Sequence, residues 1–376
     1  MLDEPLELRC GLTLKNRLAK AAMSDMLGDG AGRVTDEQCT LYRRWAEGGV
    51  ALAIIGEVQT DRRFPENPGN LVADESADDR GLARLASAGE HHGSRLWPQL
   101  GHAGALAHAS IAERAGPSAL ELPELTCRAL TVDEIEALPG RFAAAARRCR
   151  DAGFSGVEVH AGHGFLLSQF LSPLFNRRTD AYGGSIEARA SILIAIVEAI
   201  SVACGPNFAI GLKLNTTDQL DGGLVEDEAL VVVDLLDATS IDVIDLSGGT
   251  YFPGAPSSSE RTTAGPSFAD VGRRARERTS AAIMVTGGVK TRADAVALVE
   301  SGAADLVGLA RTMVLDPDLP SGWLGATPTD PTFPSFETTV PGGITAWYTR
   351  RIARLAGVDL SLDADAVAAL EWSDAR

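Results

Sequence analysis

Eight short apolar stretches recur along the chain, and a longer segment separates each from the next. This alternation limits the fold more than any other feature, because strands that alternate with helices form parallel sheets. Eight parallel strands close naturally into a (β/α)8 barrel, the TIM barrel, which is the fold class that we predict. A doubly wound open sheet is the alternative. The eight stretches span residues 17–23, 50–58, 94–100, 155–161, 208–215, 241–248, 282–288 and 304–310.

Four of the intervening segments carry the signals that begin and end helices. Thr131 and Glu134 have the spacing of a capping box, in which the two side chains satisfy backbone N–H groups of the first turn. Thr35 and Ser185 are further N-cap residues, and glycine ends three of the segments. The predicted helices span residues 35–49, 131–154, 185–205 and 291–302.

The length of 376 residues fits one barrel with insertions, so we predict a single domain over residues 1–376. A loop insertion around residues 103–130 follows the third strand and is expected to fold over the barrel mouth. Residues 316–342 are rich in Pro, Thr and Gly and predict an irregular surface segment. A C-terminal helix is expected after it.

Charge and cysteine usage exclude several classes of protein. The formal net charge of −17 disfavours binding to nucleic acid or to anionic membranes. The five cysteines are scattered and form no CxxC motif, which argues against a disulfide framework or a metal cluster. The acidic N-terminus is unlike a signal peptide, and no apolar run is long enough to span a bilayer. We therefore expect a cytoplasmic protein that acts on a small molecule, with self-association possible.

Polar residues follow the predicted strands, at the end of the barrel where such folds carry their chemistry. The group is rich in hydrogen-bond donors and poor in clustered carboxylates, so no metal site is expected. Its members are Ser24, Asp25, Glu57, Gln99, His102, His160, His163, Lys213, Asn215, Ser247, Thr286 and Arg311.

Two features after the last strands indicate phosphate binding. Gly287 and Gly288 open a turn that leads into a helix, and such turns present backbone N–H groups to an anion. Arg311 follows the eighth strand, and the loops after strands seven and eight are the usual phosphate site of this fold. The alternative is a tightly packed turn with a surface arginine.

Lys213 and Gln99 also end strands and could meet the edge of a cofactor ring. A cation among apolar neighbours needs a partner, and Gln99 can both donate and accept hydrogen bonds. On the residues alone, Lys213 could instead pair with Glu57 or Asp245, and Gln99 could be a satisfied core amide.

The histidines His160 and His163 admit three interpretations. Both could donate N–H groups to a substrate oxygen and polarise it. With Glu158, which lies on the same strand face as His160, they could bind a metal. They could also be core histidines with satisfied hydrogen bonds, and the spacing does not separate these readings.

The segment VEVHAGHGFLLSQFLSPLFNRRTDAYGGSIEARA, residues 157–190, closely resembles the signature of the old yellow enzyme family of FMN-dependent NADH:flavin oxidoreductases and ene-reductases. The resemblance covers nearly the whole chain, and its motifs occur in the order of the family. The other motifs are LKNRLAKAAMSD, WPQLGHAG, GLKLNTTD, IDVIDLSGGTY, VTGGVKTRADAVALVESGAADLVGLAR and ITAWYTRRI.

The resemblance implies FMN bound non-covalently at the carboxyl end of the barrel. By this resemblance, Ser24 meets the flavin C4 carbonyl, Gln99 the pyrimidine edge and Lys213 the N1 and C2 carbonyl region. The cofactor-binding residues that it implies are Ala21, Ala22, Met23, Ser24, Val58, Gln99, Lys213, Ser247, Gly287, Gly288, Ala310 and Arg311.

The resemblance also implies a ping-pong reaction. NAD(P)H passes hydride to flavin N5 and leaves, and an electron-poor alkene then takes the same place. His160 and His163 would hold the activating oxygen of the alkene, hydride would reach the β-carbon and a proton the α-carbon. The protein then contributes position and electrostatics, and the flavin carries the redox chemistry.

The sequence departs from the family at three positions. Phe165 stands where the family has the tyrosine that protonates the α-carbon, Ala105 where arginine is usual, and Ala22 where proline is common. Tyr251, Tyr348 or water could supply the proton instead, or Phe165 could merely pack against the substrate with slow reduction.

Dehydrogenation or amine oxidation is the alternative to alkene reduction, because neither needs that proton. Two rivals come from other classes: a barrel hydrolase with a metal held by Glu158, His160 and His163, and a non-catalytic flavin carrier.

Overall fold

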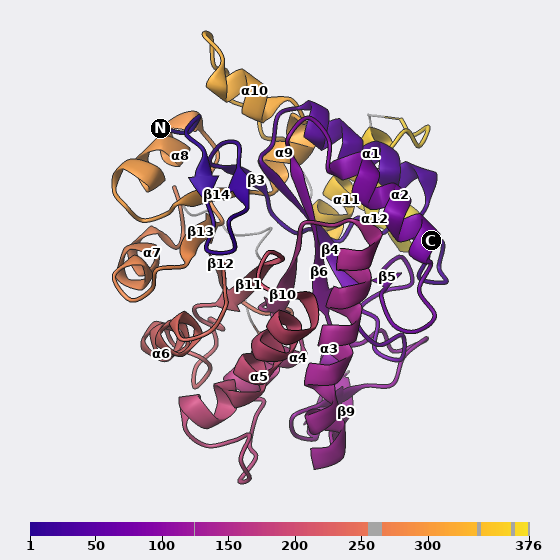
Figure 1. Ribbon diagram of the computed structural model, residues 1–376. Helices are drawn as coiled ribbons and strands as arrows, with labels where there is room; N and C mark the ends of the chain where they lie inside the picture. The colour runs from indigo at the N-terminus through magenta and orange to yellow at the C-terminus, as the bar shows by residue number, and fades with distance from the viewer. Residues whose placement is uncertain (124, 255–264, 337–339, 362–364, 375–376) are drawn as a thin grey trace.

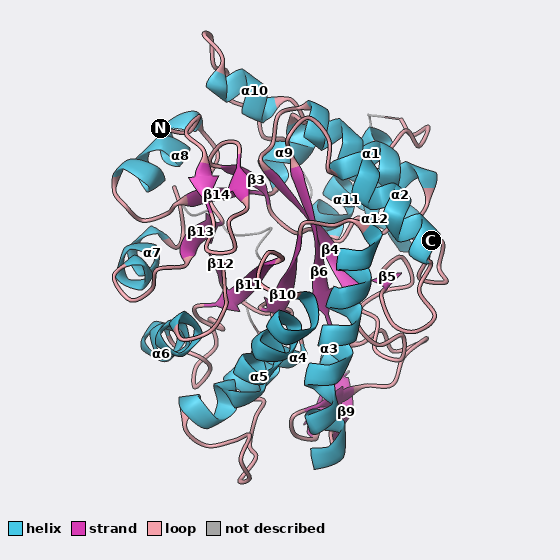
Figure 2. Ribbon diagram, in the orientation of Figure 1, coloured by secondary structure: helices cyan, strands magenta, loops and turns pink. Residues whose placement is uncertain are grey.

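Eight parallel strands form a closed barrel in the computed structural model, which describes residues 1–123, 125–254, 265–336, 340–361 and 365–374. The sheet runs in the order β3-β14-β13-β12-β11-β10-β6-β4, and a pairing of β3 with β4 closes it. Strands lie at the centre with helices around them (Figures 1 and 2), so the predicted TIM barrel is confirmed. The barrel strands are β3 (Leu18–Lys20), β4 (Leu52–Gln59), β6 (Arg95–Gly101), β10 (Gly156–Ala161), β11 (Ala209–Asn215), β12 (Val243–Ser247), β13 (Ala282–Thr286) and β14 (Leu306–Leu309).

The strand register places the polar residues of the barrel interior side by side. His160 on β10 pairs in register with Lys213 on β11, and Lys213 pairs with Asp245 on β12. One layer lower, Glu158 lies opposite Gln99 on β6. Because alternate residues of a strand point to the same face, these side chains form two layers of one polar cluster.

Long helices cover the outside of the barrel, and the four predicted helices are confirmed. Capping boxes begin α1, α3 and α8, because Thr35, Thr131 and Thr291 each accept a hydrogen bond from the N–H three residues later. The helices are α1 (Asp36–Glu47), α2 (Asp79–Gly89), α3 (Val132–Ala152), α4 (Leu166–Leu171), α5 (Ile186–Cys204), α6 (Glu226–Asp237), α7 (Ala269–Arg276), α8 (Arg292–Glu300), α9 (Arg311–Leu315), α10 (Leu319–Leu324), α11 (Gly343–Leu355) and α12 (Ala366–Asp374).

The segment around residues 103–130 is more ordered than the loop that the sequence predicts. It contains a 3-10 turn (Gly104–Leu106) and a small sheet of β7 (Ala115–Gly116), β8 (Leu120–Leu122) and β9 (Leu125–Ala129). These strands are two to five residues long. Such lengths are too short to show a strand period in the sequence.

The C-terminal part combines expected and unexpected elements. The predicted last helix is confirmed as α11, and α12 packs against it. Residues 316–342 hold the short helix α10, and residues 325–336 have no helix or strand. Residues 337–339 of this segment lie outside the described residues.

The amino-terminal end of the barrel is closed by apolar packing. A hairpin of β1 (Leu6–Glu7) and β2 (Thr13–Leu14) brings Leu8 and Leu14 against Trp97 and the first residues of several strands. A further short strand, β5 (Leu71–Val72), extends the sheet beside β4. The opposite, carboxyl end of the barrel is therefore the place for a site. Among the described helices, none has the length and apolar character needed to cross a bilayer.

Candidate active site

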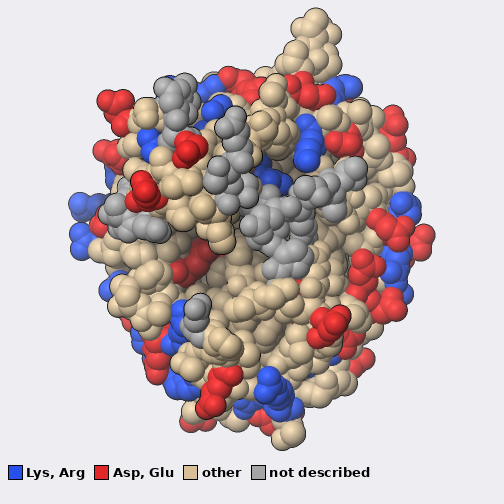
Figure 3. Space-filling model, turned by 180° about the vertical axis from the view of Figure 1, so that it is seen from behind, with Lys and Arg blue, Asp and Glu red and all other residues tan. Residues whose placement is uncertain are grey.

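A cavity of about 360 Å³ opens at the carboxyl ends of the barrel strands. The face turned away from the viewer in Figure 1 is hollowed, and both basic and acidic side chains are visible inside the hollow (Figure 3). All the predicted cofactor-binding and catalytic residues line this cavity except Ala21 and Val58. Those two side chains are fully buried in apolar clusters instead.

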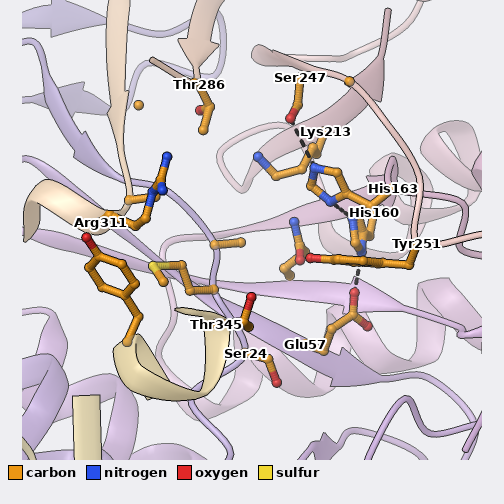
Figure 4. Close-up of a pocket in the computed structure, with 18 of the residues that line it drawn as sticks. Ser24, Glu57, His160, His163, Lys213, Ser247, Tyr251, Thr286, Arg311 and Thr345 are labelled. Atoms are coloured by element: carbon orange, nitrogen blue, oxygen red, sulfur yellow. Dashed lines mark hydrogen bonds and ion pairs between the residues drawn. The ribbon is translucent and has the colours of Figure 1, made fainter. Parts of the chain in front are cut away.

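The two histidines lie in a continuous series of hydrogen bonds at one end of the cavity (Figure 4). His160 Nε2 is 3.1 Å from His163 Nδ1, and His163 Nε2 is 3.0 Å from the Ser247 hydroxyl oxygen. His160 Nδ1 bonds to the Glu57 carboxyl. His163 has a φ of +59°, and its backbone N–H donates to Asn215 Oδ1 at 3.0 Å. Asn215 thus holds the turn after β10 that directs both imidazoles to one point.

Two aromatic rings border the histidines. The Phe165 ring lies 5.0 Å from the His160 ring, and the Tyr251 ring lies 5.8 Å from Phe165 and 5.9 Å from His163. In Figure 4 the Tyr251 ring extends toward the middle of the pocket. Tyr348, the other tyrosine considered as a proton donor, lies elsewhere in the cavity. Of the two, Tyr251 is the one with a ring contact to Phe165, the position at which the resemblance implies a tyrosine.

Beside His160, Lys213 forms a buried ion pair with Asp245, and Thr286 Oγ1 donates to Asp245 at 2.6 Å. Gln99 Nε2 donates to Glu158 at 2.5 Å. The sequence left open whether Lys213 faces a cofactor or pairs with a carboxylate, and it both lines the cavity and pairs with Asp245. Burial alone would lower the pKa of Lys213, but Asp245 and Glu158 outweigh it and raise that pKa.

The proposed metal set is not assembled. The Glu158 carboxyl bonds to Gln99 and lies within the Lys213–Asp245 cluster, below the two histidines. Within the described ranges, no group of three or more His, Cys, Asp or Glu side chains is arranged to hold a metal ion. The interpretation of His160, His163 and Glu158 as metal ligands has no geometric support.

The other end of the cavity is built by backbone turns and cations. Gly287 and Gly288 follow β13 with φ of +131° and +77°, and a Cβ atom at Gly288 would overlap the carbonyl oxygen of Gly265. Lys290 and Arg311 line the cavity beside this turn. The Arg311 guanidinium lies 5.8 Å from the centre of the Tyr348 ring, on the side of the pocket away from the histidines (Figure 4). Exposed N–H groups next to cations suit a phosphate.

Residues 1–323 match the model of the NADH:flavin oxidoreductase / NADH oxidase family. The chain belongs to this family. It is 33% identical over 350 residues to the NADH-dependent flavin oxidoreductase iliE of Hypocrea jecorina (strain QM6a), with 84% of this chain and 87% of that protein covered. This family membership confirms the resemblance to old yellow enzymes and makes the protein an FMN-dependent NAD(P)H oxidoreductase.

Two solved structures, one of a reductase and one of a dehydrogenase, are similar to this chain. A 2-naphthoyl-CoA reductase complexed with 2-naphthoyl-CoA is 28% identical with a TM-score of 0.82, covering 87% of this chain and 52% of that one. Histamine dehydrogenase from Rhizobium sp. 4-9 is 26% identical with a TM-score of 0.76, covering 85% and 47%. The chain thus spans about half the length of both proteins.

The two ends of the cavity fit the two ends of FMN. The turn at Gly287 and Gly288 leaves open the space that a side chain would fill, with Arg311 beside it for the phosphate. Gln99 and Lys213 line the other part, where donors are needed at a pyrimidine-dione edge. The residues at each end of this cavity therefore fit the chemistry of the corresponding end of FMN.

Burial shifts the titration of three groups around the histidine pair. Loss of hydration raises the pKa of Glu57 to about 8, partly opposed by the Gln59 amide. Burial and the neighbouring Glu57 raise the pKa of Glu66 to about 8. Burial, helped by the charge of Lys213, lowers the pKa of His160 to about 3. At pH 7 the His160 imidazole is therefore neutral, and the Glu57 carboxyl holds a proton most of the time.

Several residues of the cavity were not singled out from the sequence. Lys290 directly follows the glycine turn, which was a usable signal, and Thr345 lies on the expected C-terminal helix. Glu66 and Phe333 lie in irregular segments, where no pattern relates a residue to the barrel mouth. All four line the cavity.

Proposed function

We propose that the protein reduces a carbon–carbon double bond conjugated to a carbonyl group, with NAD(P)H as the reductant in a ping-pong sequence. The observation that carries this proposal is the convergence of His160, His163 and Tyr251 at the end of the cavity opposite the glycine turn. Such a set can hold an oxygen and deliver a proton, which are the two tasks that this reduction requires of the protein.

FMN, when bound, would supply the hydride chemistry that links NAD(P)H to the β-carbon of the alkene. Gly287, Gly288 and Arg311 would hold the phosphate, and Gln99 and Lys213 the pyrimidine edge. His163 presents Nε2, which also contacts the Ser247 hydroxyl, to the substrate oxygen and stabilises the negative charge that develops there. His160 supports His163, because its own two nitrogens contact Glu57 and His163 Nδ1. Because burial keeps His160 neutral, it acts as a hydrogen-bond donor and not as a charged acid.

Tyr251 is the residue that we assign to protonation of the α-carbon. Phe165 has no exchangeable proton, and its buried ring forms an apolar wall beside His160. The Tyr251 side chain is 56% exposed, so it can regain a proton from water after each turnover. Its pKa is nevertheless raised, because the dense surroundings and the nearby Glu66 and Glu57 disfavour the phenolate.

Flavin-linked dehydrogenation, including amine oxidation, is the second candidate. Phe165 favours it, because a substrate that loses hydride needs no acid at that position. The carboxyls of Glu57 and Glu66 next to aromatic rings would also suit an amine. The similarity to a histamine dehydrogenase supports this reading to the same degree as the similarity to a reductase supports the other.

Anaerobic half-reactions of the purified holoenzyme distinguish the two. We expect NADH or NADPH to bleach the flavin absorbance, and 2-cyclohexenone to restore it. Bleaching by a saturated ketone or an amine, with no recovery on addition of enones, would instead establish the dehydrogenase. FMN release on denaturation is the prerequisite, and a protein that neither contains nor takes up FMN contradicts both candidates.

A further inference from the structure

Glu57 is the first residue of the hydrogen-bond series that contains both histidines, and Ser247 is the last. The Glu57 carboxyl contacts His160 Nδ1, His160 Nε2 contacts His163 Nδ1, and His163 Nε2 contacts the Ser247 hydroxyl. The Glu57 and His160 side chains are 4% and 3% exposed. All four residues border the cavity, but Glu57 and His160 are almost fully buried, so the series runs from a buried acid to the more accessible His163 and Ser247.

The arrangement couples the tautomers of the two imidazoles. A neutral imidazole carries one N–H, so each ring donates at one nitrogen and accepts at the other. When Glu57 is protonated it donates to His160, His160 donates to His163, and His163 Nε2–H points to Ser247 and the cavity. When Glu57 is ionised every bond reverses, and His163 Nε2 becomes an acceptor. The protonation state of Glu57 therefore decides whether the cavity receives an N–H donor from His163.

We propose that Glu57 is a positioning residue that holds the proton of the histidine pair: it keeps His163 Nε2 as a donor and passes a proton through His160 and His163 to the substrate oxygen during reduction. This inference rests on the proposed alkene reduction. It adds a residue that acts on the substrate oxygen through His160 and His163, and a route for its proton.

The proton transfers balance over one turnover. As hydride reaches the β-carbon, the alkene electrons move to the substrate oxygen, the His163 Nε2–H bond breaks and an O–H bond forms. His163 Nδ1 then takes the proton of His160 Nε2, and His160 Nδ1 takes the proton of Glu57, which is left as a carboxylate.

The second half of the turnover restores the series. When the Tyr251 hydroxyl gives its proton to the α-carbon, the O–H bond breaks and the three protons return to their starting nitrogens and to Glu57. Tyr251 is then reprotonated by water. The net proton of the reduction thus comes from Tyr251. Glu57 lends its proton only between hydride transfer and protonation of the α-carbon, and so neutralises the negative charge on the substrate oxygen during that time.

Charged and titratable groups from several elements face this series. Glu66, from the segment after β4, lies close enough to Glu57 for that carboxyl to raise the pKa of Glu66, and Tyr251 lies near both. On the far side of His160, Lys213 and Asp245 act on the imidazole in opposite directions. Lys213 and burial together keep the extra proton off His160. The proton that titrates therefore belongs to the Glu57 carboxyl.

The first test compares wild type with Glu57→Gln by stopped-flow reoxidation of the NADH-reduced holoenzyme. A glutamine amide donates to His160 Nδ1 but cannot transfer a proton. We expect the rate with 2-cyclohexenone to fall roughly 10- to 100-fold, less than the roughly 100- to 10,000-fold of a direct general acid because Glu57 acts through two histidines, with KM changed less than about twofold. The wild-type rate should fall as pH rises through about 8, and the variant should show no such step. Reoxidation by ferricyanide, which needs no proton, should be equal in both.

Glu66→Gln provides the matched comparison, because it removes a neighbouring acid that does not contact His160. This variant should keep the pH step but move its midpoint lower, since one like charge near Glu57 is lost. A Glu57→Gln enzyme that reduces the enone at the wild-type rate, or that retains the pH step, overturns the proposal.

A second measurement does not depend on turnover. The second measurement is the 15N chemical shift of the imidazole nitrogens in the 15N-histidine-labelled wild-type holoenzyme. Between pH 6 and 10, His160 and His163 should change tautomer with the same midpoint, so that in each ring the protonated nitrogen becomes the unprotonated one and the reverse. If their shifts stay constant or titrate independently, the proposal fails even if no variant folds. If no enone reoxidises the wild type while ferricyanide does, the alkene reduction itself is wrong, and the NMR result still reports on the proton series.

Discussion

Phe165 is the residue at which this protein departs most clearly from its family, and its environment indicates what a hydroxyl would do there. Its ring lies 5.0 Å from His160 and 5.8 Å from Tyr251, inside the cavity lining. We expect Phe165→Tyr to raise the rate of 2-cyclohexenone reduction by about 10-fold or more, because a direct acid contributes roughly 100- to 10,000-fold. Stopped-flow reoxidation of the reduced flavin measures this step.

The companion variant is Tyr251→Phe, which should slow the same step while reduction of the flavin by NAD(P)H stays unchanged. Adding Phe165→Tyr to it should restore the rate, because one tyrosine would replace the other. An oxidative half-reaction that is the same in Phe165→Tyr and in the wild type contradicts the view that Phe165 limits protonation.

Lys20 is a second unusual residue, because it is fully buried outside the cavity lining. Its Nζ lies 4.4 Å from the centre of the Trp45 ring and 3.4 Å from the Ile54 carbonyl oxygen. Desolvation lowers its pKa to about 7. The unfolded chain therefore binds more protons than the folded protein between about pH 7 and 10.5, and the free energy of unfolding rises with pH across that window.

We expect Lys20→Met to be more stable than the wild type at pH 6, by roughly 1–4 kcal/mol as for other buried charges replaced by apolar residues. The advantage should shrink as the pH rises toward 10, because Lys20 is then neutral in the folded protein and no longer buries a charge. Thermal melting of both proteins from pH 6 to 10 checks this. If the stability difference between wild type and Lys20→Met does not depend on pH, Lys20 is charged throughout the range from pH 6 to 10.

At the scale of elements, the turn between β13 and α8 lines the end of the cavity where we propose that the FMN phosphate binds. Gly288 has a φ of +77°, and an added Cβ would overlap the Gly265 carbonyl oxygen. We expect Gly288→Ala to weaken FMN binding at least about 10-fold, because the turn must shift away from the phosphate position. Fluorescence titration of the apoprotein with FMN measures the affinity.

Gly302, at the end of α8, is the matched control. Its φ is +68°, but a Cβ there would meet no atom within 4 Å. Gly302→Ala should therefore cost roughly 1 kcal/mol of stability from backbone strain, with unchanged affinity for FMN. If both variants bind FMN equally well, the turn at Gly288 does not hold the phosphate.

The elements also show what the sequence could predict and what it could not. The barrel strands were recognisable because a parallel strand covered on both sides is a short apolar run, as at Leu52–Gln59. The strands within residues 103–130 were not, because they are too short for periodicity. The 3-10 turn before them is held by a long-range contact, that of Ala105 N–H with Gln169 Oε1.

Side-chain partners were less predictable than side-chain positions. Residues at strand ends, such as Glu57 and Lys213, were placed at the barrel mouth by strand periodicity alone. The carboxylate that pairs with Lys213 depends on strand register and on side-chain rotamers. In the structure Lys213 pairs with Asp245, and Glu57 contacts His160 instead. The hydrogen-bond series through the histidines was therefore beyond the sequence.

At the scale of the whole molecule, the cavity joins both ends of the chain. Met23 follows the first barrel strand, Arg311 begins α9 after the last one, and Thr345 belongs to the C-terminal helix α11, yet all three line it. A ligand that contacts all of these segments binds the folded barrel and not the unfolded chain. FMN should consequently stabilise the protein against global unfolding and not only order a loop.

This coupling predicts the thermal shift that FMN produces. At a free concentration 100-fold above its dissociation constant, one ligand adds about 2.7 kcal/mol to the free energy of unfolding. With the usual unfolding entropy per residue, this is a rise in Tm of about 3 °C for a chain of 376 residues. Calorimetry of the apoprotein with and without FMN should give a single transition that moves as a whole.

Two matched variants test which cation contributes to this shift. Arg311→Met should reduce the rise in Tm at the same FMN concentration, whereas Arg84→Met, which removes a surface cation paired with Asp36, should leave it unchanged. Two separate transitions, of which FMN moves only one, would mean that the segments lining the cavity do not unfold together.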